Sequence, residues 1–150
     1  MMLMNECIFC KIVSGEFPSK KVYEDEHAVA FLDINPATPG HTLVVSKKHY
    51  ENIFSISDSD LEGLVLGVKR TAKIIKEKLG IDNINIMQNN GKFAGQLVPH
   101  MHFHIIPRYP DDRVVISFPR VKVDEEGLEA LRKKMTEEEK KKPDFLDSDW

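Results

Sequence analysis

Three histidines recur at every second position of one short segment. His100, His102 and His104 alternate with the apolar residues Met101 and Phe103. In a β-strand, this period of two places all three imidazoles on one face and the apolar side chains on the other. Strand rise alone separates neighbouring rings by about 6.6 Å. The segment therefore predicts a strand whose apolar face lies in the core and whose histidine face lines a cleft.

Three interpretations of this strand remain open. A half-buried structural strand can carry imidazoles on its polar face, but three in alternation, half of the chain's six histidines, are more typical of a functional site. Alternate strand residues can also ligate a metal, and a catalytic zinc would keep one position open. The third interpretation is phosphoryl chemistry, in which one imidazole is the nucleophile and its neighbours stabilise charge and carry protons.

The elements that position these histidines follow from the hydrophobic pattern. Strands are expected at 22–24, 28–32, 42–46, 84–88, 101–107 and 114–118. The clearest helix covers 58–79, with one apolar face, Ser57 and Asp60 at its start and Gly80 at its end. A short helix or turn is expected at 7–13. A charged helix is expected at 125–142, before Pro143 and an acidic tail. The pattern predicts an α+β domain, an antiparallel meander sheet with one long helix packed on it.

The composition is that of an ordinary globular domain. The 150 residues are 41% hydrophobic and 30% charged, which suits one domain with an adequate core. The net charge of −3 gives no overall attraction to nucleic acid. No apolar run approaches the roughly 20 residues of a membrane span. The segment 1–13 lacks a basic stretch and makes a poor signal peptide, so we expect a cytoplasmic protein.

Two further motifs concern metal and phosphate. The chain's two cysteines, Cys7 and Cys10, form a C-x-x-C pair. A reducing compartment disfavours a structural disulfide, so the pair indicates metal binding, redox chemistry or plain packing. Neither G-x-x-x-x-G-K-[ST] nor G-x-G-x-x-G occurs, so a glycine cradle is not expected to hold phosphate.

The segment from His100 to Ile106 resembles the H-φ-H-φ-H-φ-φ signature of the histidine-triad (HIT) family, where φ is apolar. Other segments resemble family segments in the family's order, at 9–12, 15–16, 30–34, 39–45, 48–49 and 95–96. The resemblance covers about 7–109. It implies a HIT domain over 7–110 and leaves 111–150 as a C-terminal extension. Because the family is commonly dimeric, a homodimer is expected.

The resemblance implies a role for each histidine of the site. His102 would attack the α-phosphorus of a nucleotide and form a nucleotidyl-histidine, which water then hydrolyses. Imidazole suits this step because one ring nitrogen can attack while the other keeps its proton, and a backbone carbonyl would fix that tautomer. His104 would contact phosphate oxygens, His41 would join the catalytic cluster, and either could carry a proton to the leaving group. His100 completes the triad.

A purine nucleotide pocket is also implied by the resemblance. Asp33 corresponds to the acid that accepts hydrogen bonds from the ribose hydroxyls, although a strand-end turn residue is an equal interpretation. Asn89 and Gln96 correspond to polar groups near the phosphates or the leaving-group oxygen, with loop or turn chemistry as the alternative. The apolar residues that correspond to the base pocket are of types that more often form plain core: Phe9, Ile12, Phe31, Ile34 and Leu43.

A structural zinc ion is implied by four matched positions. Cys7, Cys10, His49 and His100 correspond to the ligands of the family's zinc-carrying members. Two thiolates and two imidazoles make a closed tetrahedral site of structural type. The alternative is that both cysteines are small buried residues.

The resemblance thus implies a nucleotide hydrolase or transferase, first of all one acting on nucleoside 5′-phosphoramidates or adenylated amines. Gln96 and the pair Pro107 and Arg108 also resemble the branch that hydrolyses dinucleoside polyphosphates, which stays an alternative. A nucleotide-binding scaffold without turnover is the second alternative. The middle histidine argues against a scaffold, because a pure binder needs no nucleophile.

Overall fold

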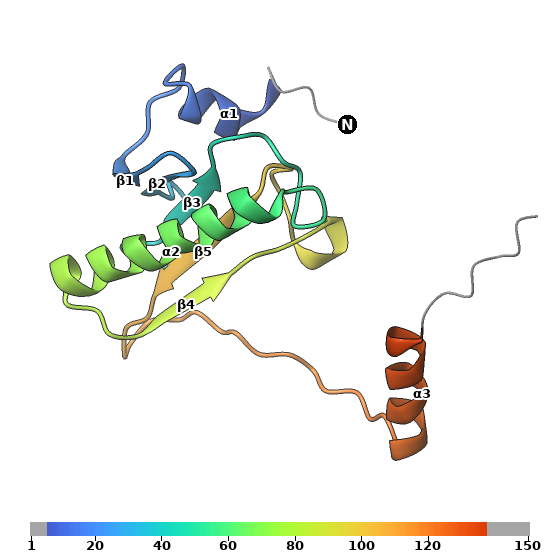
Figure 1. Cartoon of the computed structure of the whole chain (residues 1–150). Coiled ribbons are helices and arrows are strands. Elements are labelled where there is room, and N and C mark those ends of the chain that lie inside the picture. Colours follow the sequence, from blue (N-terminus) through green and yellow to red (C-terminus); the bar gives the residue numbers. More distant parts are fainter. Residues whose placement is uncertain (1–5, 138–150) are drawn as a thin grey trace, which may run out of the picture. The chain divides into compact units, whose positions relative to one another are not determined.

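A five-stranded antiparallel sheet forms the centre of the fold (Figure 1). The computed structural model describes residues 6–137. The strands are β1 (Lys21–Glu24), β2 (Ala28–Leu32), β3 (Thr42–Ser46), β4 (Ile84–Met87) and β5 (His102–Pro107), in the sheet order β1-β2-β3-β5-β4. The helices are α1 (Ile8–Val13), α2 (Asp58–Leu79), the 3₁₀ turn η2 (Lys92–Ala94) and α3 (Glu125–Thr136). The predicted α+β architecture is confirmed.

Strand register divides the sheet into two faces. Leu43 pairs with His104 and Val45 with His102, so both histidines lie on the face of the odd-numbered β3 residues. That face packs against α1 in one core cluster, made of Cys7, Phe9, Ile12, Val29, Phe31, Leu43 and Val45. The opposite face packs against α2 in a second cluster, which includes Ala28, Ala30, Val44, Leu64, Val68, Ile75 and Ile105. The short helix therefore adjoins the histidine face, and the long helix supports the sheet from behind.

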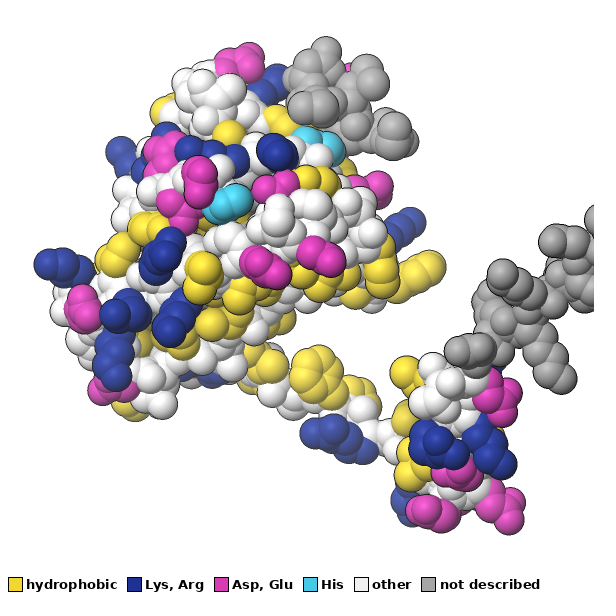
Figure 2. All heavy atoms as spheres, in the orientation of Figure 1, with side chains coloured by type: hydrophobic (Ala, Val, Ile, Leu, Met, Phe, Trp, Pro, Cys, Tyr) yellow, Lys and Arg dark blue, Asp and Glu magenta, His cyan; other side chains and the backbone are white. Residues whose placement is uncertain are grey.

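Helix α2 has the bounds that its sequence predicts. The Ser57 hydroxyl accepts a hydrogen bond from the Asp60 backbone N–H at 3.2 Å, and Gly80 ends the helix with φ 67°. Gly67 lets the helix approach the sheet, because a Cβ there would lie 2.8 Å from the Cβ of Ala28. Helix α2 carries exposed charged side chains of both signs: Asp58, Glu62, Lys69, Arg70, Lys73 and Lys76. Figure 2 shows side chains of both signs, in dark blue and magenta, on this face of the molecule.

Several local predictions are wrong. The segment 114–118 forms no strand, because it pairs with none of the strands found within residues 6–137. The charged helix ends at Thr136 rather than at 142, since Glu137 is already extended. Residues 138–142, Pro143 and the acidic tail lie outside the described residues. Strand β5 begins at His102, one residue later than expected.

The chain divides into two compact units, one ending at Val114 and one beginning at Val115. The first contains the sheet, and the second contains α3. Across residues 6–137, no helix combines the length and the apolar character needed to cross a membrane.

Candidate functional site

Four polar residues gather on the histidine face of the sheet. The Asp33 N–H donates to the His41 carbonyl at 2.9 Å, which extends the β2–β3 ladder and sets both residues beside His104. The His41 Nε2 atom lies 3.0 Å from His104 Nδ1 and 3.6 Å from an Asp33 carboxylate oxygen. The ring centroids of His102 and His104 are 5.1 Å apart. This distance is shorter than strand rise alone predicts, and the two ring planes are inclined at 62°.

The His102 ring is held in one tautomer by the backbone. Its Nδ1 lies 2.6 Å from the His100 carbonyl oxygen. A carbonyl oxygen can only accept, so Nδ1 carries the proton and Nε2 carries a lone pair. Phe9 packs edge-on against the ring, with centroids 5.1 Å apart, and the side chain is buried. Burial lowers the pKa of His102, which keeps the imidazole neutral and nucleophilic near pH 7.

His41 and His104 are also neutral groups. Burial lowers the pKa of His41, and the Asp33 carboxylate opposes that shift only in part. Burial, together with the nearby His102 and His41 rings, lowers the pKa of His104 to about 4. The side chains on this face therefore include one carboxylate and three uncharged imidazoles at neutral pH. Such a site offers a nucleophile and hydrogen-bond donors.

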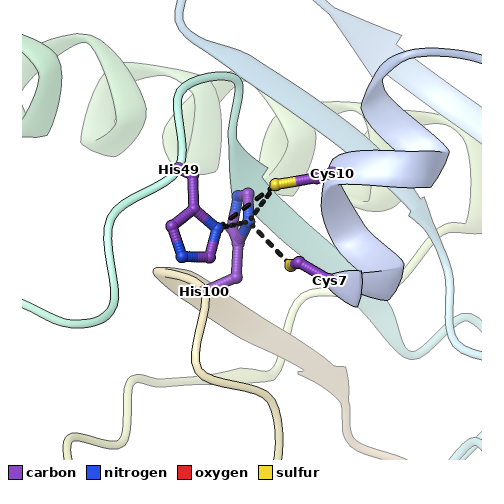
Figure 3. A group of neighbouring side chains, drawn as sticks. All are labelled: Cys7, Cys10, His49 and His100. Atoms are coloured by element: carbon purple, nitrogen blue, oxygen red, sulfur yellow. Dashed lines mark hydrogen bonds between the residues drawn. The ribbon is translucent and has the colours of Figure 1, made fainter. Parts of the chain in front are cut away.

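A second cluster joins three segments that are far apart in the sequence (Figure 3). Cys7 and Cys10 come from the start of α1, His49 from the loop after β3, and His100 from the residues before β5. The sulfur-to-nitrogen distances are 3.2–3.5 Å, and the two Nδ1 atoms are 3.2 Å apart. A tetrahedral zinc ion places nitrogen and sulfur ligands about 3.3–3.8 Å apart. The donor set therefore fits a closed Cys₂His₂ site.

The tautomer of His100 also fits metal binding. Its Nε2 lies 2.7 Å from the Ser46 carbonyl oxygen, so Nε2 carries the proton and Nδ1 directs its lone pair at the sulfurs. Asp33, His41 and His104 form another compact group of possible metal ligands. There the Ala37 N–H donates to His41 Nδ1 at 3.0 Å, so a metal on Nε2 would leave the ring no nitrogen for its proton. This chemistry argues against a metal bound by Asp33, His41 and His104.

The residues predicted to bind the nucleotide lie in different surroundings in the structure. Most of the expected base-pocket residues lie together in the core cluster beside α1: Phe9, Ile12, Phe31 and Leu43. Ile34 is 89% exposed and lies outside that cluster. Asn89 is half-buried near Gly95. The Gln96 amide is bonded to loop backbone, accepting from the Gly91 N–H at 2.8 Å and donating to the Glu51 carbonyl at 2.6 Å.

Some residues of the site were missed from the sequence. Ser46 orients His100 through its backbone carbonyl, and Ala37 orients His41 through its N–H. Backbone groups leave no signal in residue type, so only the folded loops reveal them. His27 is half-buried against α2, with Nδ1 3.3 Å from an Asp60 carboxylate oxygen. Its ring occupies the space that Gly63 leaves free.

Comparison with known proteins agrees with this geometry. Residues 14–111 match the family model described as HIT domain. A HIT-like protein of Methanocaldococcus jannaschii is 59% identical over 116 residues, which cover 77% of this chain and 89% of that protein. The adenosine 5′-monophosphoramidase of Saccharomyces cerevisiae is 39% identical over 130 residues, covering 86% and 80%. The crystal structure of a HIT family member from Bacillus subtilis has a TM-score of 0.80 at 40% identity, covering 86% of this chain and 94% of that one. With its histidine face and these relatives, the chain belongs to the HIT family.

Proposed function

We propose that this protein is a nucleotide hydrolase in which His102 Nε2 attacks the α-phosphorus of a nucleoside 5′-phosphoramidate or an adenylated amine. The observation that carries the proposal is the 2.6 Å contact from His102 Nδ1 to the His100 carbonyl, which leaves Nε2 free. The yeast relative's name, adenosine 5′-monophosphoramidase, supports the substrate class.

The reaction proceeds in two displacements at phosphorus. In the first, the His102 Nε2 lone pair forms a bond to the α-phosphorus while the bond to the leaving amine breaks, and the amine departs with a proton taken from water. The resulting imidazolium keeps its Nδ1 proton, which the His100 carbonyl accepts at 2.6 Å. In the second, water attacks the phosphorus, loses a proton and releases the nucleoside monophosphate from His102.

Asp33 has the free acceptor capacity that a ribose would need. One of its carboxylate oxygens accepts the Asn35 N–H at 2.8 Å, which leaves further lone pairs. Gln96 and Arg108, which resemble residues of the branch that hydrolyses dinucleoside polyphosphates, both form hydrogen bonds within the protein. Gln96 bonds loop backbone, and Arg108 pairs with Asp112 at 2.9 Å and with Asn85 at 2.8 Å. These contacts favour the phosphoramidate over the polyphosphate.

The test compares adenosine phosphoramidate, AMP-lysine and diadenosine polyphosphates as substrates. His102→Ala is expected to lower kcat by about 10⁴-fold or more, to abolish the nucleotidyl-protein seen by mass spectrometry, and to keep AMP binding. The matched control is His27→Gln, because His27 is a half-buried histidine that lies on the other side of the sheet, against α2. Near wild-type kcat in His102→Ala would refute the mechanism. Faster polyphosphate turnover would select the alternative substrate, and no turnover of any substrate would favour a scaffold.

We further propose that Cys7, Cys10, His49 and His100 bind a structural zinc ion. When bound, zinc would tie the N-terminal segment to the strand that carries the nucleophile. A cavity of about 670 Å³ reaches Cys10 and His49 but is not lined by His102, whereas Cys7 and His100 are fully buried. The open side of the cluster is therefore separate from the nucleophile, as expected for a structural metal.

We also propose that the protein is a homodimer. The loop that contains Ile53 and the loop that contains Asn90 lie side by side, because the Ile53 N–H donates a hydrogen bond to the Asn90 side chain at 2.8 Å. Both loops carry large apolar side chains that are almost fully exposed. Phe54 is 86%, Phe93 104% and Leu97 92% exposed. Such apolar side chains mark interaction surfaces, and a second copy of the chain is the proposed occupant. Phe93→Ser should yield a monomer in light scattering, and a wild-type monomer would contradict the proposal.

The cytoplasmic location stays a prediction.

A further inference from the structure

The loop between β2 and β3 determines where His41 carries its proton. The Ala37 backbone N–H lies 3.0 Å from His41 Nδ1. A backbone amide can only donate, so Nδ1 must hold a lone pair. A neutral imidazole has one N–H, and that proton therefore lies on Nε2. The backbone of this loop, rather than a side chain, selects the tautomer of His41.

The proton on His41 Nε2 in turn determines the tautomer of His104. His41 Nε2 lies 3.0 Å from His104 Nδ1, a hydrogen-bond distance that requires one proton between the two nitrogens. The Asp33 carboxylate, at 3.6 Å, is too far away to accept that proton instead. His41 therefore donates, His104 Nδ1 accepts, and the His104 proton lies on Nε2. His102 and His104 are thus held in opposite tautomers, one with a free Nε2 and one with an Nε2–H.

We propose that His41 is a positioning residue, which holds His104 as an Nε2–H donor to a phosphoryl oxygen and does not itself carry a proton to the leaving group. The inference rests on the proposed attack by His102. Passing the His41 proton to His104 would leave His41 without a proton on either nitrogen. Protonating His41 fully would place a proton on Nδ1 and break the bond from Ala37. Both routes are unfavourable, whereas a fixed hydrogen bond to His104 needs neither.

The geometry assigns a second positioning role to Thr38. Its hydroxyl donates to the Pro107 carbonyl at 2.6 Å, and its own carbonyl accepts the His41 N–H at 3.1 Å. Thr38 is only 4% exposed. Pro107 ends β5, the strand that carries His104. The hydroxyl therefore joins the loop that orients His41 to the strand that carries its partner, and so maintains their 3.0 Å contact.

The decisive test separates a positioning residue from a proton carrier at His41. His41→Phe removes the donor, and His41→Gln restores an amide donor and an acceptor but cannot relay a proton. We expect His41→Phe to lower kcat about 10–100-fold with little change in KM, as for other side chains that orient a functional histidine. His41→Gln is expected to recover much of this loss. A Gln variant as inactive as the Phe variant would overturn the positioning role.

A spectroscopic measurement tests the tautomers without turnover. In protein labelled with ¹⁵N-histidine, long-range proton–nitrogen NMR correlations should show His104 protonated on Nε2 and His102 on Nδ1. His104 should become a mixture of tautomers in His41→Phe. A wild-type spectrum with His104 protonated on Nδ1 would refute the inference whatever the activity. Loss of the His102 mechanism leaves this spectrum unchanged, so the two proposals can fail separately.

Thr38→Val gives the second arm, with Thr71→Val as its control. Thr71 is likewise a buried threonine, whose hydroxyl bonds the Gly67 carbonyl at 2.8 Å within α2, away from the histidine face. We expect Thr38→Val to lower kcat at unchanged KM and to mix the His104 tautomers, while Thr71→Val changes neither. Melting temperatures of both variants identify any general loss of folding. A Thr38→Val variant with wild-type kcat and a wild-type His104 spectrum would show that the hydroxyl has no positioning role.

Discussion

Burial of a neutral His104 makes the stability of the folded protein depend on pH. In the unfolded chain this imidazole has an ordinary pKa near 6.5, and in the folded protein burial and the rings of His102 and His41 lower that pKa to about 4. Between these two values the unfolded chain binds a proton that the folded protein does not. Stability is therefore complete above pH 6.5 and is lost as the pH falls toward 4.

The size of this loss follows from the interval between the two pKa values. Each pH unit within it lowers the free energy of unfolding by about 1.4 kcal/mol. From about pH 6.5 to about pH 5, His104 alone would account for about 2 kcal/mol. Partial exposure of the ring reduces this to about 1–2 kcal/mol. His41 and His102, whose pKa values are also lowered, act in the same direction.

The assay is urea unfolding of the wild type and of His104→Gln, each at about pH 8 and about pH 5. Glutamine keeps a neutral polar side chain and removes the titration. Release of a metal at low pH affects both proteins, so it cancels in the difference. The wild type is expected to lose about 1–2 kcal/mol more than the variant. Equal pH dependence in the two proteins would show that the His104 pKa is not lowered by burial.

Three other perturbations test separate parts of the structure. Asp33→Asn should weaken ribonucleotide binding by about 1.5–3 kcal/mol and leave 2′,3′-dideoxy analogues nearly unaffected, as measured by calorimetry; equal losses would make Asp33 a turn residue. Elemental analysis of the wild type is expected to detect about one equivalent of zinc, which Cys10→Ala should lose. Cys10→Ala should also lower Tm while kcat changes little, whereas His100→Ala should lower both Tm and kcat. Metal-free wild type, together with an unchanged Tm in Cys10→Ala, would return the cysteines to the core. Gly63→Ala should destabilise the fold by about 1–3 kcal/mol, because its Cβ would lie 2.2 Å from the His27 ring, and a wild-type melting curve would contradict this packing.

Local pattern was enough to predict the elements that carry the site. The bounds of α2, β2 and β3 agree with the sequence predictions, because helix periodicity, end caps and β-branched runs act within one segment. The strand predicted at 114–118 is absent, since a strand also needs a neighbour to pair with. The apolar residues of this segment could not show whether a neighbouring strand would be available for pairing.

By itself, the sequence determined which residue types are available for chemistry: an alternating strand that presents His102 and His104 on one face, and the two cysteines and two histidines that we propose as zinc ligands. Only the tertiary structure decided how these groups act together. Strand register brings His41 beside His104, which is 63 residues later, and chain folding brings Cys7 within 3.3 Å of His100. The tautomers of these histidines depend on backbone groups in loops, because a hydrogen bond is set by position and direction, which residue type does not specify.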